Sequence, residues 1–219
     1  MKNVKAVVFD LDGVIVDSER LYEEAGEIVV RKRGVSKKIT KKILASLKGR
    51  RLADIWSYLK DEFDLHDTVS DLASEHSSEF FRLVNTKLRM MKGSGIFIEK
   101  IKDSYKLALT TSGSLEYVQR LRKKFPGVKS FNCVVTGNEV KKGKPDPEPY
   151  IITCKKLGVK PKETIVIEDT PNGVRSAKAA GCICIAVTFT FAKKQLKEAD
   201  YIADSFNEVK KILGVMNGN

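Results

Sequence analysis

The sequence predicts an α/β protein in which a parallel, doubly wound sheet carries an all-helical insertion after its first strand. The chain opens with a short apolar run, Val4–Phe9, which is typical of a buried parallel strand and is followed by an acid. No strand-like run occurs between Val16 and Met91, whereas strands and helices alternate from Lys92 onward. Such alternation is typical of a parallel sheet with helices on both faces.

The expected elements follow from the spacing of apolar residues and from glycine and proline stops. Helices of the insertion are expected from Leu21 to a stop at Gly34, and over Ile39–Leu47, Leu52–Leu59 and Val69–Leu88. Later strands are expected at Leu107–Thr110, Phe131–Thr136, Thr164–Ile167 and Ile183–Val187, with a weak edge strand at Tyr201–Ala203. Later helices are expected at Ser114–Phe125, Pro147–Leu157, Gly173–Ala180 and Phe206–Leu213.

These elements indicate a discontinuous, Rossmann-like core formed by residues 1–16 and 91–219, with a helical cap domain at residues 17–90. The insertion directly follows the first strand. We therefore expect it to lie above the carboxyl edge of the sheet, where it can cover a site.

The composition predicts a soluble, folded protein. Hydrophobic residues make up 42% and charged residues 31% of 219 residues, which is ordinary for a folded soluble protein. No run approaches the ~20 apolar residues of a membrane span, and the start of the chain leaves no room for a signal peptide. We expect a cytoplasmic monomer that contacts no membrane.

His66 and His76 lie in an acidic stretch without ligand spacing, and we expect both at the solvated surface.

The net charge of +12 favours anionic partners without identifying them. Residues 31–51 hold ten Lys or Arg and no acid, whereas residues 52–80 hold eight acids and one Lys. The simpler interpretation is two solvated helix faces of opposite sign, and a sharper one is that Lys48-Gly49-Arg50-Arg51 faces a phosphorylated ligand. Nucleic-acid binding is a further alternative, but no aromatic residue is interleaved with the basic ones, as stacking on single strands would require. We therefore expect no nucleic-acid partner.

Polar groups follow several of the expected strands, where parallel strands share one edge of the sheet. They are Asp10 and Asp12 after the first strand, Thr111 and Ser112 after the second, Lys144 in a proline-stiffened loop, and Glu168 and Asp169 after the strand Thr164–Ile167. Each group alone has a structural explanation. For example, Asp-x-Asp-Gly also occurs in calcium loops, although the further acids of such loops are missing here. Their ordered convergence on strand ends is harder to explain as structure, and it predicts one polar pocket.

The chemistry of such a pocket is specific. Crowded carboxylates repel one another, and Mg²⁺ accepts their oxygens together with phosphate oxygens. A carboxylate held against the metal can attack phosphorus to give an aspartyl phosphate. A second acid, two residues on, can protonate the leaving oxygen and later activate water. Lysine, hydroxyl and backbone N–H groups would hold the phosphoryl oxygens.

Four motifs occur in a characteristic order along the chain. They are Phe9-Asp-Leu-Asp-Gly-Val-Ile-Val-Asp-Ser18, Thr111-Ser112, Lys144-Pro-Asp-Pro147, and Ile167-Glu-Asp-Thr-Pro-Asn-Gly173 followed by Ala179-Ala-Gly181. This order, which spans essentially the whole chain, resembles the haloacid dehalogenase-like hydrolases. The helical insertion resembles the cap of the branch that contains β-phosphoglucomutase and phosphoglycolate phosphatase.

The resemblance implies a role for each site residue. Asp10 would be the nucleophile and Asp12 the general acid and base, with the Asp12 backbone carbonyl also on Mg²⁺. The phosphate would be held by Thr111, the Ser112 amide and Lys144. Glu168 and Asp169 would complete the metal site. Because dehalogenase members lack the second acid of the pair, Asp12 favours phosphoryl transfer.

The cap segment bears on the choice between a phosphatase and a mutase. Lys48-Gly49 resembles a cap-loop Lys-Gly that reaches into the site of β-phosphoglucomutase, and Arg50, Arg51 and Tyr22 are further candidate substrate contacts. The mutase carries an arginine where this chain has Leu52 and a histidine where it has Tyr22. A mutase must hold a bisphosphate intermediate and exclude water. The loss of both residues favours a phosphatase acting on a small sugar or polyol phosphate, with a phosphosugar mutase as the alternative.

Overall fold

The computed structural model describes residues 4–36, 39, 43, 47, 50 and 52–217. Two compact units make up the chain: Met1–Val16 with Met90–Asn219, and Asp17–Arg89. We call the first the sheet unit and the second the helical unit. Met90 belongs to the sheet unit, where it forms an isolated β-bridge with Val16. The expected helix Ile39–Leu47 lies largely outside the described residues.

Within the described residues, the sheet unit is built on six parallel strands in the order β3-β2-β1-β4-β5-β6. They are β1 (Ala6–Phe9), β2 (Lys106–Thr110), β3 (Cys133–Val135), β4 (Thr164–Glu168), β5 (Ile183–Val187) and β6 (Tyr201–Ala203). From β1 the chain adds β2 and β3 on one side and then crosses to the other side for β4, β5 and β6. The predicted doubly wound α/β class is thus confirmed. The winding reverses between β1 and β4, which is where open α/β sheets bind ligands.

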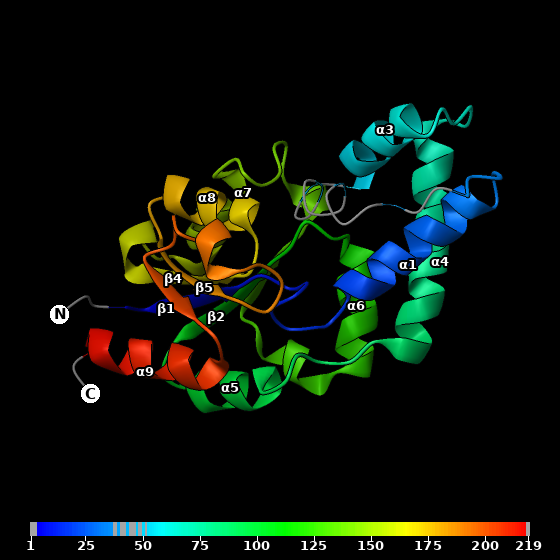
Figure 1. The fold of residues 1–219 in the computed structure, drawn as a ribbon. Helices are drawn as coiled ribbons and strands as arrows, with labels where there is room; N and C mark the ends of the chain where they lie inside the picture. The colour runs from blue at the N-terminus through cyan, green and yellow to red at the C-terminus, as the bar shows by residue number, and fades with distance from the viewer. Residues whose placement is uncertain are drawn as a thin grey trace. The chain divides into compact units, whose positions relative to one another are not determined.

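Helices cover both faces of this sheet (Figure 1). On one face lie α7 (Glu148–Leu157) and α8 (Pro171–Ala179), whose residues Tyr150 and Val174 share a buried apolar cluster with Val8 of β1 and Val166 of β4. Side chains alternate between the faces of a strand. The neighbouring residue Phe9 therefore points to the opposite face.

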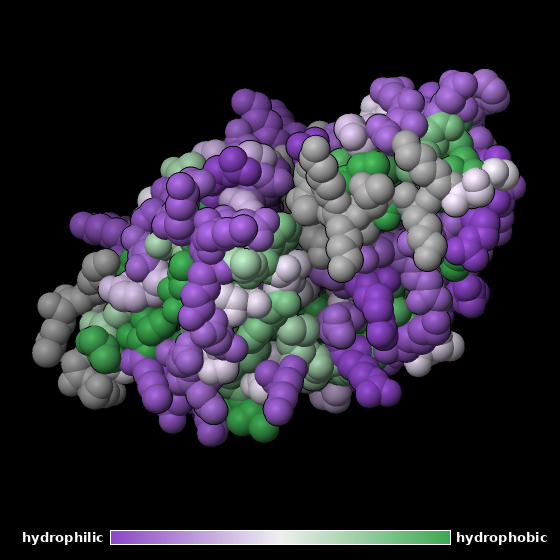
Figure 2. Space-filling model, in the orientation of Figure 1, coloured by the Kyte–Doolittle hydropathy of each residue, from purple (hydrophilic) through white to green (hydrophobic). Residues whose placement is uncertain are grey.

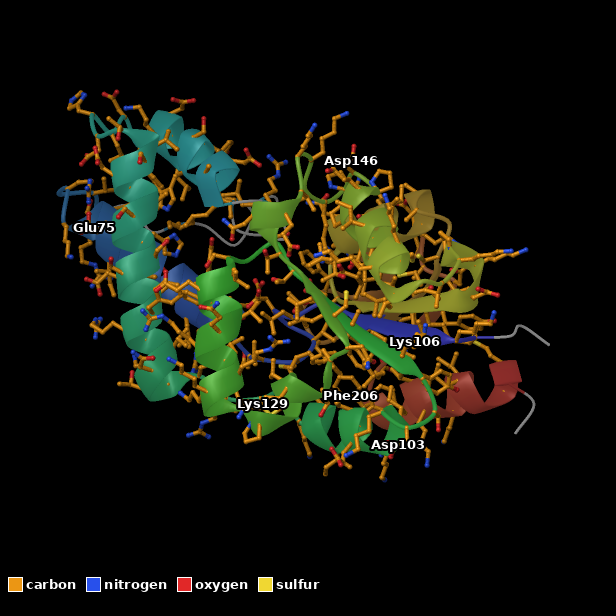
Figure 3. The ribbon with its side chains drawn as sticks, turned by 180° about the vertical axis from the view of Figure 1, so that it is seen from behind. Glu75, Asp103, Lys106, Lys129, Asp146 and Phe206 are labelled. Atoms are coloured by element: carbon orange, nitrogen blue, oxygen red, sulfur yellow. The ribbon has the colours of Figure 1, made fainter. Side chains whose placement is uncertain are left out.

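On that opposite face, α5 (Ser94–Ile101) and α9 (Phe206–Asn217) close the core with aromatic rings. The Phe9 ring lies 5.9 Å from Phe97 of α5 and 5.6 Å from Phe131, in edge-on arrangements. Phe206, labelled in Figure 3, begins α9 and stacks on Phe97 at 5.1 Å. Burying these rings on one side and the α7–α8 cluster on the other fixes the position of β1.

The remaining helix of the sheet unit is α6 (Leu115–Lys124), which follows the loop after β2. Short 3₁₀ segments complete the connections: η1 (Pro126–Ser130), η2 (Gly137–Glu139), η3 (Pro161–Glu163) and η4 (Lys193–Gln195). The strand register brings the carboxyl ends of β1, β2 and β4 to one level, because Phe9 lies opposite both Leu109 and Ile167. The groups that follow these strands therefore share one edge of the sheet.

The helix α5 was not among the elements expected from the sequence. Its segment, Ser94–Ile101, is short and rich in apolar and β-branched residues, so its periodicity does not separate a helix from a buried strand. Gly93 adopts a left-handed conformation with φ 86° and starts the helix.

The helical unit contains α1 (Glu19–Arg31), α3 (Leu52–Glu62) and α4 (Val69–Lys87) among its described residues. Its core includes Val29 of α1, Trp56 of α3 and Leu72 of α4. The helix α4 begins where the Thr68 hydroxyl accepts a hydrogen bond from the Asp71 N–H at 3.1 Å, which satisfies one free backbone donor.

Opposite charges in the helical unit pair directly. Arg33 donates to both carboxylate oxygens of Asp67, at 2.8 and 2.7 Å, and to Glu75 at 2.7 Å. Lys32 donates to Glu75 at 2.9 Å and to Glu79 at 3.0 Å. The two faces of opposite sign are therefore not independent at these residues: part of the basic segment pairs with the acidic one, while the Lys32 side chain stays 51% exposed.

The expectation that His76 is solvated is also wrong, whereas His66 is exposed as expected. His76 is 2% exposed, because it lies between Leu72 and Phe80 on the buried stripe of α4, four residues from each. Its acidic sequence neighbours occupy other sides of the helix. The Trp56 N–H donates to His76 Nδ1 at 2.9 Å, and His76 Nε2 lies 3.0 Å from the Tyr22 carbonyl oxygen.

The surface seen in Figure 2 is mostly hydrophilic, with apolar residues in small separate areas. In the described part of the chain, every helix falls short of the length and apolarity that spanning a bilayer demands.

Candidate active site

Three carboxylates converge at the carboxyl edge of the sheet. Asp10 follows β1, Glu168 ends β4, and Asp169 comes next, and one oxygen of each lies within 4.8 Å of the others. Their relative exposures are 7%, 0% and 0%. The fold explains this convergence, because β1 and β4 are hydrogen-bonded neighbours and the Asp10 N–H donates to the Ile167 carbonyl at 3.0 Å.

Lys144 joins two of these carboxylates. Its Nζ donates to Asp10 Oδ1 at 2.5 Å and to Glu168 Oε1 at 2.6 Å, and the side chain is buried. The loop that carries it leads into α7 and is tied to α8, since the Ser176 hydroxyl donates to the Asp146 carbonyl at 2.6 Å. Asp146 is labelled on this loop in Figure 3.

The cluster holds more negative than positive charge. Its three carboxylates and the Lys144 ammonium together carry a net charge of −2 when all four groups are ionised. Burial raises the pKa of Asp10 well above its ordinary value, and the Lys144 ammonium only partly offsets this. Burial alone lowers the pKa of Lys144, but the charges of Asp10 and Glu168 outweigh it and raise that pKa. The pKa of Asp10 is thus raised mainly by desolvation, and that of Lys144 by the two carboxylates that it contacts.

This donor set fits a magnesium ion. Mg²⁺ takes carboxylate oxygens, and its charge equals the excess in the cluster. The residues that could hold it are Asp10, Glu168 and Asp169, which the structure brings together.

Glu168 is held firmly by protein donors. Its Oε1 accepts from Lys144 and from the Tyr150 hydroxyl, each at 2.6 Å. Its Oε2 accepts from the Asp169 N–H at 3.1 Å and from the Thr170 N–H and hydroxyl at 3.4 and 3.3 Å. Tyr150 is fully buried, and burial raises the pKa of its phenol, so the hydroxyl remains a donor. These contacts fix the orientation of the Glu168 carboxylate.

Two glycines make room for the carboxylates. A Cβ at Gly13, where φ is +78°, would lie 2.0 Å from Asp169 Oδ2. A Cβ at Gly173, in the first turn of α8, would lie 1.9 Å from the Glu168 Cδ. Both separations are far below van der Waals contact, so no larger residue fits at either position without moving the acid.

Asp12 and Thr111 lie beside this cluster. The Thr111 hydroxyl, after β2, is 3.4 Å from Asp12 Oδ2, and it accepts the Gly113 N–H at 2.9 Å. The Tyr117 hydroxyl of α6 donates to Asp12 Oδ1 at 2.9 Å. Asp12 is half-buried. The structure therefore joins the second acid of the Asp10–Asp12 pair to the loop after β2.

The other sequence-predicted residues are less closely connected. Ser112 is half-buried in the loop after β2, and its carbonyl oxygen packs so near Gly137 that a Cβ there would lie 2.3 Å away. In the helical unit, the Tyr22 ring packs on His76 at 4.3 Å and on Phe80 at 5.1 Å. Arg50 is exposed. Lys48, Gly49 and Arg51 lie outside the described residues.

Tyr117 and Tyr150 contact acids of the site but were not predicted from the sequence. Both lie in the first turn of a helix that follows a motif loop, three residues or fewer from its start. The signal was therefore present: an aromatic residue with a polar tip, one helical turn beyond a predicted polar loop, usually finds a partner when buried.

Comparisons with known proteins agree with this geometry. Residues 7–187 match the family model described as haloacid dehalogenase-like hydrolase. Hexitol phosphatase A of Escherichia coli K12 is 31% identical over 208 residues, which cover 94% of this chain and 93% of that protein. The phosphorylated carbohydrates phosphatase of Thermotoga maritima is 34% identical over 180 residues, covering 81% and 82%. The crystal structure of β-phosphoglucomutase from Clostridium difficile is similar in fold, with a TM-score of 0.81 over 98% of both chains and 23% identity.

Proposed function

The chain belongs to the haloacid dehalogenase-like hydrolases, and from this premise we propose that it is a magnesium-dependent phosphatase that works through an aspartyl phosphate on Asp10. Its substrate class is a small phosphorylated metabolite, a sugar or polyol phosphate. The observation that carries the proposal is the buried group of Asp10, Glu168 and Asp169 around Lys144, with Asp12 beside it. Relatives named as phosphatases of hexitols and of phosphorylated carbohydrates support both the activity and the substrate class.

In this proposal Asp10, Glu168 and Asp169 would hold the metal, together with the Asp12 backbone carbonyl. Bound Mg²⁺ supplies positive charge that offsets the carboxylates and the phosphoryl oxygens. Lys144, the Thr111 hydroxyl and the Ser112 N–H bind the remaining phosphoryl oxygens. Lys144 suits this role because its ammonium already contacts Asp10, and therefore lies where the phosphoryl group must approach.

The first step transfers the phosphoryl group to the enzyme. A carboxylate oxygen of Asp10 forms a bond to phosphorus as the bond from phosphorus to the substrate oxygen breaks. Asp12, in its acid form, gives its proton to that leaving oxygen, and the free sugar or polyol departs. The Lys144 ammonium, 2.5 Å from Asp10 Oδ1, orients the nucleophilic carboxylate.

The second step releases inorganic phosphate. Asp12, now a carboxylate, takes a proton from water as the water oxygen attacks phosphorus. The bond from phosphorus to the Asp10 oxygen breaks, which restores both acids to their starting forms. A single residue can serve as acid and then as base because the leaving oxygen and the attacking water occupy the same position.

The test uses a generic aryl phosphate, p-nitrophenyl phosphate, with magnesium and with a chelator in its place. We expect turnover only with magnesium, and we expect Asp10→Asn to abolish it while the circular dichroism spectrum stays that of the wild type. A panel of sugar and polyol phosphates then identifies the substrate class by phosphate release. Full activity of Asp10→Asn would refute the proposal.

The mutase alternative uses the same site and differs only in the acceptor of the phosphoryl group. Incubation with β-glucose 1-phosphate, magnesium and a catalytic amount of the sugar bisphosphate separates the two. We expect free phosphate to form faster than glucose 6-phosphate. The reverse order would make the chain a phosphosugar mutase.

A further inference from the structure

Each carboxylate oxygen of Asp12 accepts a hydrogen bond from a hydroxyl group in the sheet unit. Tyr117 Oη donates to Oδ1 at 2.9 Å, and Thr111 Oγ1 donates to Oδ2 at 3.4 Å. A carboxylate turns readily about its terminal torsion, which has broad minima. Two donors on opposite oxygens therefore restrict the direction in which Asp12 presents its proton-transferring oxygen.

The phenol of Tyr117 reaches Asp12 from a fixed position. Tyr117 lies in the first turn of α6, and its N–H donates to the hydroxyl of the N-cap residue Ser114 at 3.2 Å. The side chain is 4% exposed, so its ring is packed among neighbours. A capped helix start and a buried ring leave the hydroxyl little freedom to move away from Asp12.

The hydroxyl groups of Thr111 and Tyr117 differ in their other roles in the proposed reaction. In the proposed reaction the Thr111 hydroxyl binds a phosphoryl oxygen, so its proton turns from Asp12 to the substrate. The Thr111 oxygen also accepts the Gly113 N–H at 2.9 Å. Its hydroxyl has one proton to donate, which can go either to Asp12 or to the phosphoryl oxygen. Tyr117 is not one of the residues to which the proposed reaction assigns phosphate binding, so its hydroxyl can continue to hold Oδ1.

We propose that Tyr117 is a positioning residue for Asp12: its hydroxyl anchors Oδ1, so that Oδ2 faces the leaving oxygen and later the attacking water. This inference rests on the proposed function, in which Asp12 is the general acid and base. Substrate binding then releases Oδ2 from Thr111 for proton transfer, while the anchor on Oδ1 keeps the carboxylate in place.

The first experiment compares Tyr117→Phe with Tyr201→Phe, both of which remove only a hydroxyl group. Tyr201 lies on the edge strand β6 and is 37% exposed, which makes it a matched control. We expect Tyr117→Phe to lower kcat with p-nitrophenyl phosphate by about tenfold, because misplaced acid–base catalysts lose part of their effect. The KM and the inhibition constant of inorganic phosphate should stay at wild-type values, and Tyr201→Phe should match the wild type.

The second experiment asks whether Tyr117 acts through Asp12. In an Asp12→Asn background the hydroxyl has no acid left to position, so adding Tyr117→Phe should change kcat by no more than about twofold. Leaving-group dependence gives an independent readout. An alkyl phosphate needs its leaving oxygen protonated more than p-nitrophenyl phosphate does, so Tyr117→Phe should lower kcat/KM more for glycerol 2-phosphate.

The outcomes separate this inference from the proposed function. Unchanged kcat in Tyr117→Phe, an equal loss in the Asp12→Asn background, or equal losses for alkyl and aryl substrates would each overturn the role of Tyr117, with the phosphatase activity intact. Absence of any magnesium-dependent phosphate release by the wild-type protein would instead overturn the proposed function, and the inference with it.

Discussion

Gly13 and Asp169 lie so close together that a Cβ on the glycine would fall 2.0 Å from Asp169 Oδ2. Gly13 belongs to the loop after β1 and Asp169 to the loop after β4, so this approach joins the two strand ends that supply the carboxylates. The same glycine has φ +78°, a conformation that other residues adopt only with strain. The Gly of Asp10-Leu-Asp-Gly is thus a structural requirement of the acid cluster.

The first prediction concerns Gly13→Ala. The added methyl group must displace the Asp169 carboxylate or the loop, so the donors of the proposed metal site move apart. We expect magnesium-dependent turnover to fall at least about a hundredfold, since small displacements of reacting groups cost factors of that size. We expect magnesium to raise the melting temperature of the wild type and to raise that of Gly13→Ala by less, which thermal denaturation measures without reference to activity.

Gly34→Ala is the matched control for this variant. Gly34 has φ +76°, nearly that of Gly13, but a Cβ there meets nothing within 4 Å. It therefore carries the same backbone strain, about 1 kcal/mol, without the clash. Equal losses of turnover in the two variants would show that strain, and not the contact with Asp169, explains the effect.

The second prediction concerns Lys144→Met. Removing the ammonium leaves the buried Asp10 and Glu168 carboxylates without their ion-pair partner. In the absence of magnesium we expect the free energy of unfolding to fall by about 3 kcal/mol, as for other buried pairs that lose one member. Urea denaturation followed by circular dichroism measures it.

Lys142→Met, two residues away in the same loop, provides the comparison. Its side chain is 75% exposed and its nearest acid, Asp146, is 4.0 Å away. An exposed pair of this kind contributes less than about 1 kcal/mol. If the two methionine variants lost equal stability, the ion pairs of Lys144 would not be what holds the acid cluster together.

Much of the fold follows from local sequence patterns. The apolar runs that became β1, β4 and β5 are buried on both faces, so their composition alone marks them as central parallel strands. The segment that became α5 is also apolar, and in the fold it is a helix whose Phe97 packs against Phe9 and Phe206. The helix α5 was therefore not predicted, because its conformation depends on tertiary packing that the local sequence pattern does not reveal.

The candidate site was predictable in its acids, because they follow strands whose carboxyl ends meet at one edge, and in Lys144, because it lies in the polar loop between β3 and α7. Tyr117 and Tyr150 were not, because each contacts an acid from a different element, 105 and 18 residues distant in sequence. The prediction that His76 is solvated was wrong for a related reason. Its acidic neighbours suggested solvent, but the four-residue spacing to Leu72 and Phe80 places it in the core.

The third prediction is a pH dependence of the helical unit. Burial lowers the pKa of His76 to about 4, against an ordinary value of 6.5. Its Nδ1 accepts the Trp56 N–H, so protonating Nδ1 would set two donors against each other. A histidine whose pKa is depressed in the folded state stabilises above its unfolded pKa, and this stability is lost as the pH falls from 6.5 toward 4.

Between about pH 7.5 and pH 5, this linkage should reduce the stability of the helical unit by about 2 kcal/mol. Trp56 is the single tryptophan of the chain, so its fluorescence during urea unfolding reports on the helical unit. His76→Gln, which cannot take up a proton in this range, should show a much weaker dependence. A wild-type urea-unfolding midpoint that stays constant over this pH range would contradict the prediction.

The central claim is that phosphate is cleaved through a covalent bond to Asp10. Asp12→Asn cannot activate water, so a phosphoenzyme should accumulate when this variant is mixed with p-nitrophenyl phosphate and magnesium and then quenched in acid. Peptide mass spectrometry then locates the phosphoryl group. We expect one phosphoryl group, on Asp10, and none when Asp10→Asn is added. Turnover without any acyl phosphate, or with the phosphoryl group on another residue, would contradict the proposed reaction.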